Sequence, residues 1–227
     1  MSQSPKRKAT KAVKQPRSRA AKTTRDNILR SAKRIFSKEG YSGARVDRIS
    51  KAAKSHDSLI YYYFGSKEKL FVAVLENAYQ DMVEAGKALT LNPNDPIQSF
   101  RTITEFPFRY YLKNPELIVL LGTENLQQGK HIAKSDSVDH YSLPVIKMLE
   151  DVVKQGQELG LFQPNINCRQ LYMAMTALGY FYVSNRYTFS TFLNTDLMQE
   201  SETEAWARYI SDLLLLRVQQ ANNNEAT

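Results

Sequence analysis

The chain has 227 residues, of which 42% are hydrophobic, and its formal net charge is +8. This length allows one large or two small domains with a core, and the single cysteine, Cys168, excludes an internal disulfide. No apolar run approaches the ~20 residues of a membrane helix, and the N-terminus lacks the apolar stretch of a secretory signal. We therefore expect a cytoplasmic protein that makes no contact with a membrane.

Charge and composition differ between the two ends of the chain. Residues 1–70 hold 19 Lys and Arg against 5 Asp and Glu, whereas the remainder holds 12 against 18. This asymmetry predicts an N-terminal part that binds a polyanion, followed by a mildly acidic body. Glycine and proline are sparse, and strand-like alternation is absent over most of the length, which predicts an all-α fold.

Residues 1–22 carry eight basic side chains and no acidic one, so we expect this arm to be disordered by itself. It either contacts DNA phosphates or a minor groove, or it serves as a solubilising tail. The first helix is predicted over residues 24–39, because Ile28, Ala32 and Phe36 share one helical face. Gly40 is expected to end it.

Two short helices with a tight turn are predicted next, over residues 46–53 and from Asp57 onward. Such a helix-turn-helix lays its second helix in a major groove of DNA. In that second helix we expect Ile60, Tyr63 and Phe64 to face the core. Leu59, Tyr61 and Tyr62 are then expected to face outward.

The segments 45–53 and 59–70 together resemble the N-terminal domain of the TetR family of transcriptional regulators, a likeness that covers residues 23–80. The specific part is the aromatic run 61–64 followed by Gly-Ser-Lys-Glu-Lys-Leu. The chain departs from the family at the turn, where Lys54-Ser55-His56 replaces the usual Gly-Val-Ser. A lysine in the left-handed conformation there costs roughly 1 kcal/mol. His56 takes the N-cap position unless Ser55 does.

Within the predicted DNA-binding domain, residues 23–84 with the helix-turn-helix at about 44–63, we expect two kinds of contact with double-stranded DNA. Phosphate contacts are expected from Arg45, Tyr62 and Lys67. Base-edge contacts are expected from His56, Asp57, Ser58, Leu59 and Tyr61.

A fourth helix, capped by Ser66, has an apolar stripe that runs from Leu70 past Met82. It leaves the DNA-binding domain and enters the body, so we expect it to link the two mechanically. The body is predicted over residues 85–221 and a loose tail over 222–227. Helices are expected over 97–112, from Asn114-Pro115, and from Leu143-Pro144 to about Gly160.

Two long helices, at about 168–186 and 202–219, are apolar on more than one face. Such helices are fully buried or meet another subunit. The resemblance implies that they pair in a homodimer, with interface residues Leu178, Tyr182, Trp206, Ile210 and Leu213.

The resemblance also implies a small-molecule effector, unknown from sequence, bound among the body helices. The expected pocket residues are Phe106, Arg109, Tyr110, Asn125, Tyr172, Met175, Thr176 and Tyr180. The segment 179–189 and Glu124-Asn125 resemble a subgroup of the family that regulates catabolism of nitrogen heterocycles and aromatic acids. That likeness is one of fold alone.

The sequence shows no metal-ligand spacing, since His56, His131 and His140 are scattered, and no phosphate-binding glycine loop. We therefore expect no cofactor and no enzymatic activity. The prediction is a homodimeric repressor that a small molecule releases from a palindromic operator. One alternative is an activator, or a ligand-independent DNA-binding protein, with the same DNA-binding domain; a remote alternative is a helical small-molecule enzyme.

Overall fold

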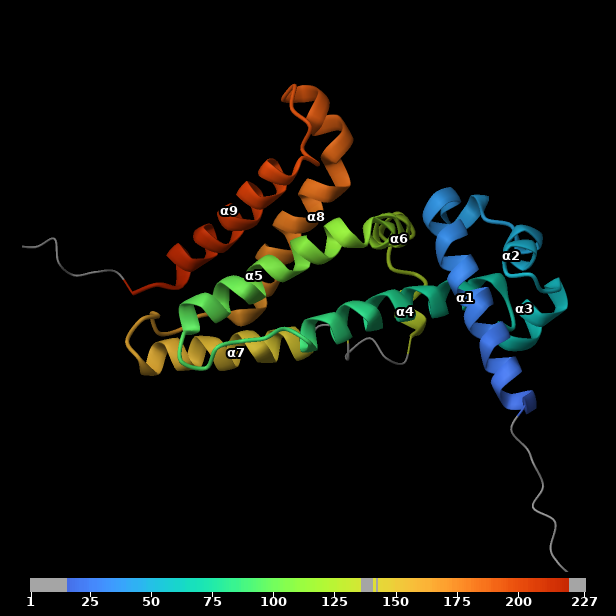
Figure 1. The fold of residues 1–227 in the computed structure, drawn as a ribbon, viewed down its shortest axis with the longest axis horizontal. Helices are drawn as coiled ribbons and strands as arrows, with labels where there is room; N and C mark the ends of the chain where they lie inside the picture. The colour runs from blue at the N-terminus through green and yellow to red at the C-terminus, as the bar shows by residue number, and fades with distance from the viewer. Residues whose placement is uncertain (1–15, 136–140, 142, 221–227) are drawn as a thin grey trace, which may run out of the picture.

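The computed structural model of the chain describes residues 16–135, 141 and 143–220. Over these residues the chain is helical and forms no strand, which confirms the all-α prediction (Figure 1). None of the described helices is both long and apolar enough to cross a bilayer. The helices are α1 Pro16–Gly43, α2 Val46–Ala52, α3 Asp57–Phe64, α4 Lys67–Lys87, α5 Pro96–Lys113, α6 Pro115–Leu126, the 3-10 turn η1 Ile132–Lys134, α7 Leu143–Glu158, α8 Cys168–Phe192 and α9 Glu200–Val218.

Local sequence signals account for where several helices begin. The Ser66 hydroxyl accepts the backbone N–H of Lys69 at 3.0 Å, so Ser66 caps α4 as predicted. Asp95 caps α5 in the same way, and α5 and α6 each start with a proline, whose missing N–H is not needed there.

α1 differs from its prediction at the N-terminal end. It begins at Pro16, so residues 16–22 of the predicted disordered arm are helical. The reason is that alanine, lysine and arginine are strong helix formers, and the helix already nucleated at residue 24 extends through them. At the other end Gly40 has φ +68 and interrupts the helix, as expected. Residues 1–15 and the tail 222–227 lie outside the described residues.

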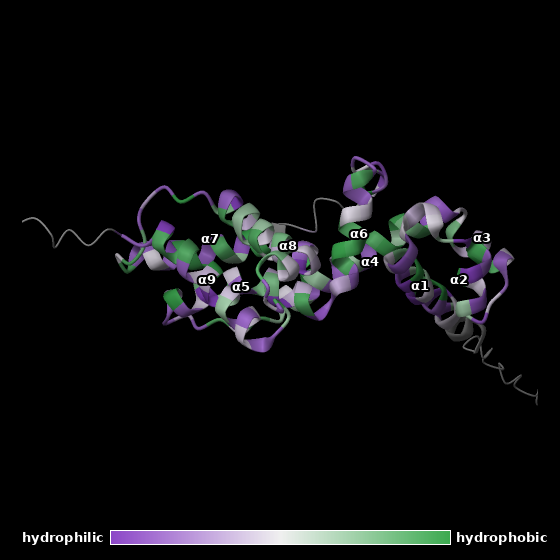
Figure 2. Cartoon of the chain, turned by 90° about the horizontal axis from the view of Figure 1, so that it is seen from above, coloured by the Kyte–Doolittle hydropathy of each residue, from purple (hydrophilic) through white to green (hydrophobic). Residues whose placement is uncertain are grey.

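α1, α2, α3 and the first turns of α4 form a small unit that we call the head. Ile28 and Phe36 of α1, Ile49 of α2 and Ile60 of α3 are completely buried against one another and against α4. Both views place α1, α2 and α3 at one end of the molecule and α5, α7, α8 and α9 at the other, with α4 and α6 between them (Figures 1 and 2).

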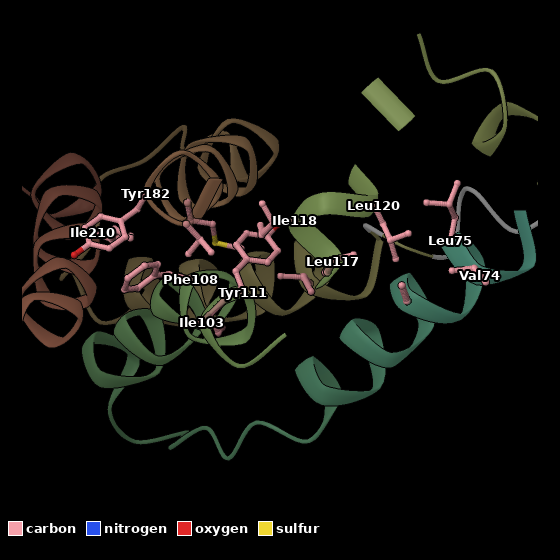
Figure 3. Close-up of a cluster of buried hydrophobic side chains, with 14 of the residues drawn as sticks. Val74, Leu75, Ile103, Phe108, Tyr111, Leu117, Ile118, Leu120, Tyr182 and Ile210 are labelled. Carbon is pink, nitrogen blue, oxygen red and sulfur yellow. The ribbon is translucent and has the colours of Figure 1, made fainter. Parts of the chain in front are cut away.

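The remaining helices form the body, in which α5 runs through the middle. Phe108 of α5, Tyr182 of α8 and Ile210 of α9 meet in its core (Figure 3), with the rings of Phe108 and Tyr182 5.2 Å apart. α5 and α8 approach closely at Gly179, where an added Cβ would lie 3.0 Å from the Phe108 Cα. α8 continues to Phe192, six residues beyond its predicted end.

Candidate nucleic-acid interface and ligand pocket

The turn between α2 and α3 takes the strained conformation that its sequence implies. Lys54 has φ +51, in the left-handed region where a glycine is usual. The Ser55 N–H donates to the Ser50 carbonyl at 2.9 Å and fixes the turn. His56, not Ser55, holds the N-cap position of α3, and its side chain makes no capping hydrogen bond.

α3 presents two tyrosines outward. Ile60 and Phe64 are buried in the head, whereas Tyr61 is 52% exposed and Tyr62 is 78% exposed. Leu59 was expected to face outward as well, but it is half-buried and packs on the core, as Tyr63 does. The exposed face of α3 therefore consists mainly of phenol groups and the polar residues at its start, His56 and Ser58.

Asp57 has a partner inside the head. Its carboxylate accepts a hydrogen bond from the hydroxyl of Ser50, a buried residue of α2. This contact ties the end of α2 to the first turn of α3. A carboxylate at that position also complements the helix dipole, as its place in the sequence indicates, whereas the hydrogen bond to Ser50 was not predicted.

The two predicted phosphate-binding cations differ in how far their side chains are exposed to solvent. Arg45 is exposed, with Nε 3.0 Å from Asp47 Oδ1. Lys67 is half-buried, its Nζ 4.8 Å from the centre of the Tyr41 ring and 3.5 Å from the Ser42 carbonyl oxygen. Burial lowers the pKa of Lys67. Lys67 thus also holds the end of α1 against α4.

A pocket of about 380 Å³ lies among α4, α5, α6, α7 and α8. Four of the eight predicted pocket residues line it: Asn125, Tyr172, Thr176 and Tyr180. Three of them come from α8 at a spacing of four, which puts them on one helical face.

The other four predicted residues do not line this pocket, and those predictions were wrong. Met175 is completely buried, because one residue off the 172–176–180 face turns it into the core. Arg109 binds Glu204 through two hydrogen bonds of 2.5 and 2.9 Å, so its charge is already paired. Phe106 and Tyr110 pack on each other, with ring centres 5.7 Å apart.

Ten lining residues were missed: Tyr79, Met82, Val83, Tyr111, Leu117, Leu121, Tyr141, Val145, Met173 and Ala177. Most belong to apolar stripes that the sequence assigns to a core. Periodicity shows that such a stripe is buried, but it does not show that the stripes of five helices leave a space where they meet.

Residues 127–135, which we call the strap, follow α6 and return to the head. Glu124, buried at the end of α6, accepts the backbone N–H groups of His131 and Ile132 at 2.7 and 2.8 Å. Its second oxygen lies 2.8 Å from His131 Nδ1. The His131 ring lies against Tyr41 and Phe71 of the head, with ring centres 4.6 and 5.0 Å away.

The strap has further contacts with α4. Lys134 forms an ion pair of 2.7 Å with Glu68, and the Ser135 hydroxyl donates to Glu76 at 2.7 Å. Among buried side-chain polar atoms of the described residues, only His131 Nε2 has no partner. This cluster was not predicted, because Glu124 and His131 match no sequence motif.

Two of the predicted dimer-interface residues are buried within the single chain. Ile210 is completely buried, and Tyr182 donates its hydroxyl to the Leu197 carbonyl at 2.8 Å. Ile210 is not available to a partner, so that prediction was wrong. Tyr182 also lines a groove between α8 and α9, so its place in an interface stays a prediction. Leu178 and Trp206 are half-buried, and Leu213 is exposed.

The surface of α8 and α9 nevertheless carries large apolar side chains in solvent: Met173, Phe181, Phe192, Leu193, Tyr209, Leu213 and Leu216. A groove of about 480 Å³ between the two helices is lined by Phe181, Phe189, Trp206 and Tyr209 among others. Over the residues that the structure describes, no group of three or more His, Cys, Asp or Glu is placed to hold a metal ion.

The chain matches two descriptions of protein families. Residues 28–74 match "Bacterial regulatory proteins, tetR family", and residues 96–214 match "Tetracyclin repressor-like, C-terminal domain". The chain is 44% identical to the HTH-type transcriptional repressor NicS of Pseudomonas putida, over 88% of this chain and 94% of that protein. It is 28% identical to the HTH-type transcriptional repressor SCO4008 of Streptomyces coelicolor, over 71% and 79%.

Solved structures show the same fold at low identity. A TetR transcription regulator from Haloarcula marismortui superimposes with a TM-score of 0.62 at 18% identity, over 88% of this chain and all of that one. The fatty acid degradation regulator FadR from Bacillus halodurans gives a TM-score of 0.62 at 19% identity, over 85% and 94%.

Proposed function

The chain belongs to the TetR family of bacterial transcriptional regulators, and we propose that it is a repressor which a small-molecule effector releases from a palindromic operator. The family consists of DNA-binding regulators that act as dimers, and it is not a family of enzymes. We also propose which residues contact DNA and which residues join the two subunits.

One observation supports a response to an effector: α4 belongs to both the head and the pocket. Leu70 and Phe71 near its start are completely buried in the head core. Tyr79, Met82 and Val83 farther along line the pocket. A ligand that favours one position of this helix therefore changes the position of the head, which is the differential interaction that an allosteric effect requires.

The strap gives a second connection between the same two regions. Asn125 lines the pocket, and its neighbour Glu124 holds His131 against Tyr41 and Phe71 of the head. A shift at the end of α6 is thus passed to the head through buried, hydrogen-bonded groups, which transmit displacement well because they have few alternative arrangements.

On the DNA side, two heads of a homodimer would place their α3 helices in successive major grooves, ~34–36 Å apart. We propose Arg45, Tyr62 and Lys67 as phosphate contacts. His56, Ser58 and Tyr61 are proposed as base contacts, with Leu59 and Asp57 contributing through the shape of the α3 start. The net charge of +14 over residues 1–70 favours this surface for DNA.

The names of the two relatives favour repression over activation, since both are described as repressors. A repressor acts where the chromosome is, so we propose a cytoplasmic location. An activator with the same head is the second candidate.

The test begins with selection of duplex fragments by the purified full-length chain, followed by footprinting of the retained sequence. We expect a palindrome with half-sites one helical turn apart. A reporter placed behind that sequence should be expressed less when the protein is present. Increased expression would favour an activator, and failure to retain any duplex at low ionic strength would overturn the proposed function.

A further inference from the structure

Four tyrosine side chains from three helices meet in the pocket: Tyr79 of α4, Tyr111 of α5, and Tyr172 and Tyr180 of α8. Each interacts electrostatically with others of the set, since Tyr172 and Tyr180 both raise the pKa values of Tyr79 and Tyr111. Burial is the larger cause, and it raises the pKa of Tyr79 to about 12. All four phenols are therefore protonated at neutral pH and able to donate hydrogen bonds.

These four hydroxyl groups have no hydrogen-bond partner among the described residues, yet none of them is sealed off from the cavity. Four unmatched phenols that line one space are informative, because buried polar groups are normally hydrogen-bonded. A purely hydrocarbon ligand would bury these donors without partners, which lowers its affinity. The arrangement requires a ligand, or water, that accepts hydrogen bonds.

Among the residues that the structure describes, no charged side chain lines the walls around the phenols. The Glu124 carboxylate acts on this site from outside the lining, since after burial and Tyr172 it is a further cause that raises the pKa of Tyr79. An anionic ligand would lose its hydration here without gaining a counter-cation from the described walls, and the Glu124 carboxylate would repel it. The site thus disfavours negative charge, while its donors favour acceptor atoms.

The size and shape of the pocket further restrict the class of ligand that it can hold. A volume of about 380 Å³ is near the lower end for small-molecule pockets, which suits one or two rings. On one wall the rings of Tyr79 and Tyr141 stack with centres 5.0 Å apart and planes 19° apart. Stacked, flat side chains favour a flat ligand.

We propose that this pocket binds an uncharged, planar ring compound whose carbonyl or ring-nitrogen atoms accept hydrogen bonds from the tyrosine hydroxyls. The inference rests on the proposed effector-responsive function and names the chemical class of the effector. The tyrosines supply direction through their O–H groups, and the apolar residues Met82, Leu117 and Leu121 supply the contact area.

The experiment uses ligand-observed NMR on the full-length protein with four probes at millimolar concentration: benzamide, benzoate, benzylammonium and cyclohexanecarboxamide. We expect benzamide to bind most tightly, because it alone is uncharged, planar and an acceptor. Benzoate or cyclohexanecarboxamide binding as tightly as benzamide would overturn the proposal, and so would no binding of benzamide.

Two variants test the hydroxyl groups themselves. Tyr172→Phe and Tyr180→Phe keep the rings and should each weaken benzamide binding by about three- to tenfold. Tyr187→Phe is the matched control, since Tyr187 is an exposed tyrosine of the same helix outside the pocket, and it should change nothing. Equal affinity in all three variants would remove the phenols from recognition.

DNA binding is measured on the same samples, which separates the two proposals. If the protein retains the selected duplex but does not bind benzamide, the proposed ligand class is wrong and the proposed function as a DNA-binding regulator still stands. Benzamide binding without any duplex binding would support the pocket chemistry and overturn the proposed function.

Discussion

The hydrogen bond between Ser50 and Asp57 decides what a substitution at the start of α3 does. Asp57→Ala leaves the buried Ser50 hydroxyl with only the Asp47 carbonyl, 3.0 Å away, as acceptor, and it removes the acid from the first turn of α3. We expect the free energy of unfolding to fall by about 1–3 kcal/mol, measured by urea denaturation.

Asp57→Asn keeps an acceptor oxygen and should restore most of the loss, whereas Ser58→Ala at the exposed neighbouring position should stay within about 0.5 kcal/mol of the parent. If Asp57→Ala is as stable as the parent but selects a different operator sequence, Asp57 reads bases and the structural role is wrong.

Between elements, the strap joins α6 to the head through one buried carboxylate. Glu124→Ala removes the acceptor of three donors and leaves them buried, so we expect a loss of about 3 kcal/mol or more in the free energy of unfolding. Hydrogen exchange at the amides of residues 131 and 132 should accelerate most, since Glu124 is their partner.

His131→Phe separates packing from hydrogen bonding in the strap. The phenylalanine ring keeps contact with Tyr41 and Phe71 but has no bond to Glu124. We expect weaker dependence of operator affinity on pocket occupancy, with Lys130→Ala, an exposed position of the same strap, as the unaffected control. Unchanged exchange in Glu124→Ala would show that the strap does not depend on this cluster.

α5 and α9 are also joined by charge, and this pair predicts a pH dependence. The hydrogen bonds from Arg109 lower the pKa of Glu204 below its ordinary value. The unfolded chain therefore holds this proton more tightly than the folded one, so the pair stabilises the fold above the unfolded pKa and loses that effect as pH falls through the folded pKa.

Glu204→Gln should accordingly reduce the loss of stability on acidification, with a modest effect because the pair is partly exposed to solvent. Thermal unfolding from neutral to acidic pH, compared with Glu200→Gln at the start of the same helix, measures it. Parallel curves for parent and Glu204→Gln would contradict the linkage.

At the scale of the whole molecule, local patterns predicted elements and failed where distant elements meet. Ser66 and Gly40 mark helix ends through contacts within a few residues, so sequence alone located them. Tyr172 and Tyr180 were predicted from their aromatic character alone, and the same criterion also selected Phe106 and Tyr110, which do not line the pocket. Tyr111 and His131 were missed as site residues because their roles depend on helices far away in the sequence.

The prediction of the dimer interface has the same limit, because it also depends on contacts between distant helices. α8 and α9 are apolar on several faces, and periodicity does not tell which face the chain covers itself. Ile210 proved internal, while Phe181 and Tyr209 remain in solvent on the two sides of one groove. Exposed apolar groups of this size usually meet a partner, and in this family the partner is a second copy.

Dimerisation through this surface makes a prediction that involves both ends of the molecule. The double variant Phe181→Glu with Tyr209→Glu places two charges on each side of the two-fold contact, whose desolvation and repulsion oppose association. We expect a monomer in sedimentation at concentrations where the parent is dimeric. Leu126→Glu, an exposed apolar position on α6, is the control and should stay dimeric.

The monomer should also lose affinity for a two-half-site operator, because each head then binds alone. The slope of log affinity against log salt should fall to about half, since only half of the phosphate contacts remain. This second readout matters because a misfolded variant would lose DNA binding entirely, whereas a folded monomer keeps a reduced, salt-dependent affinity for one half-site. A variant that stays dimeric and keeps the full salt slope would place the subunit contact elsewhere.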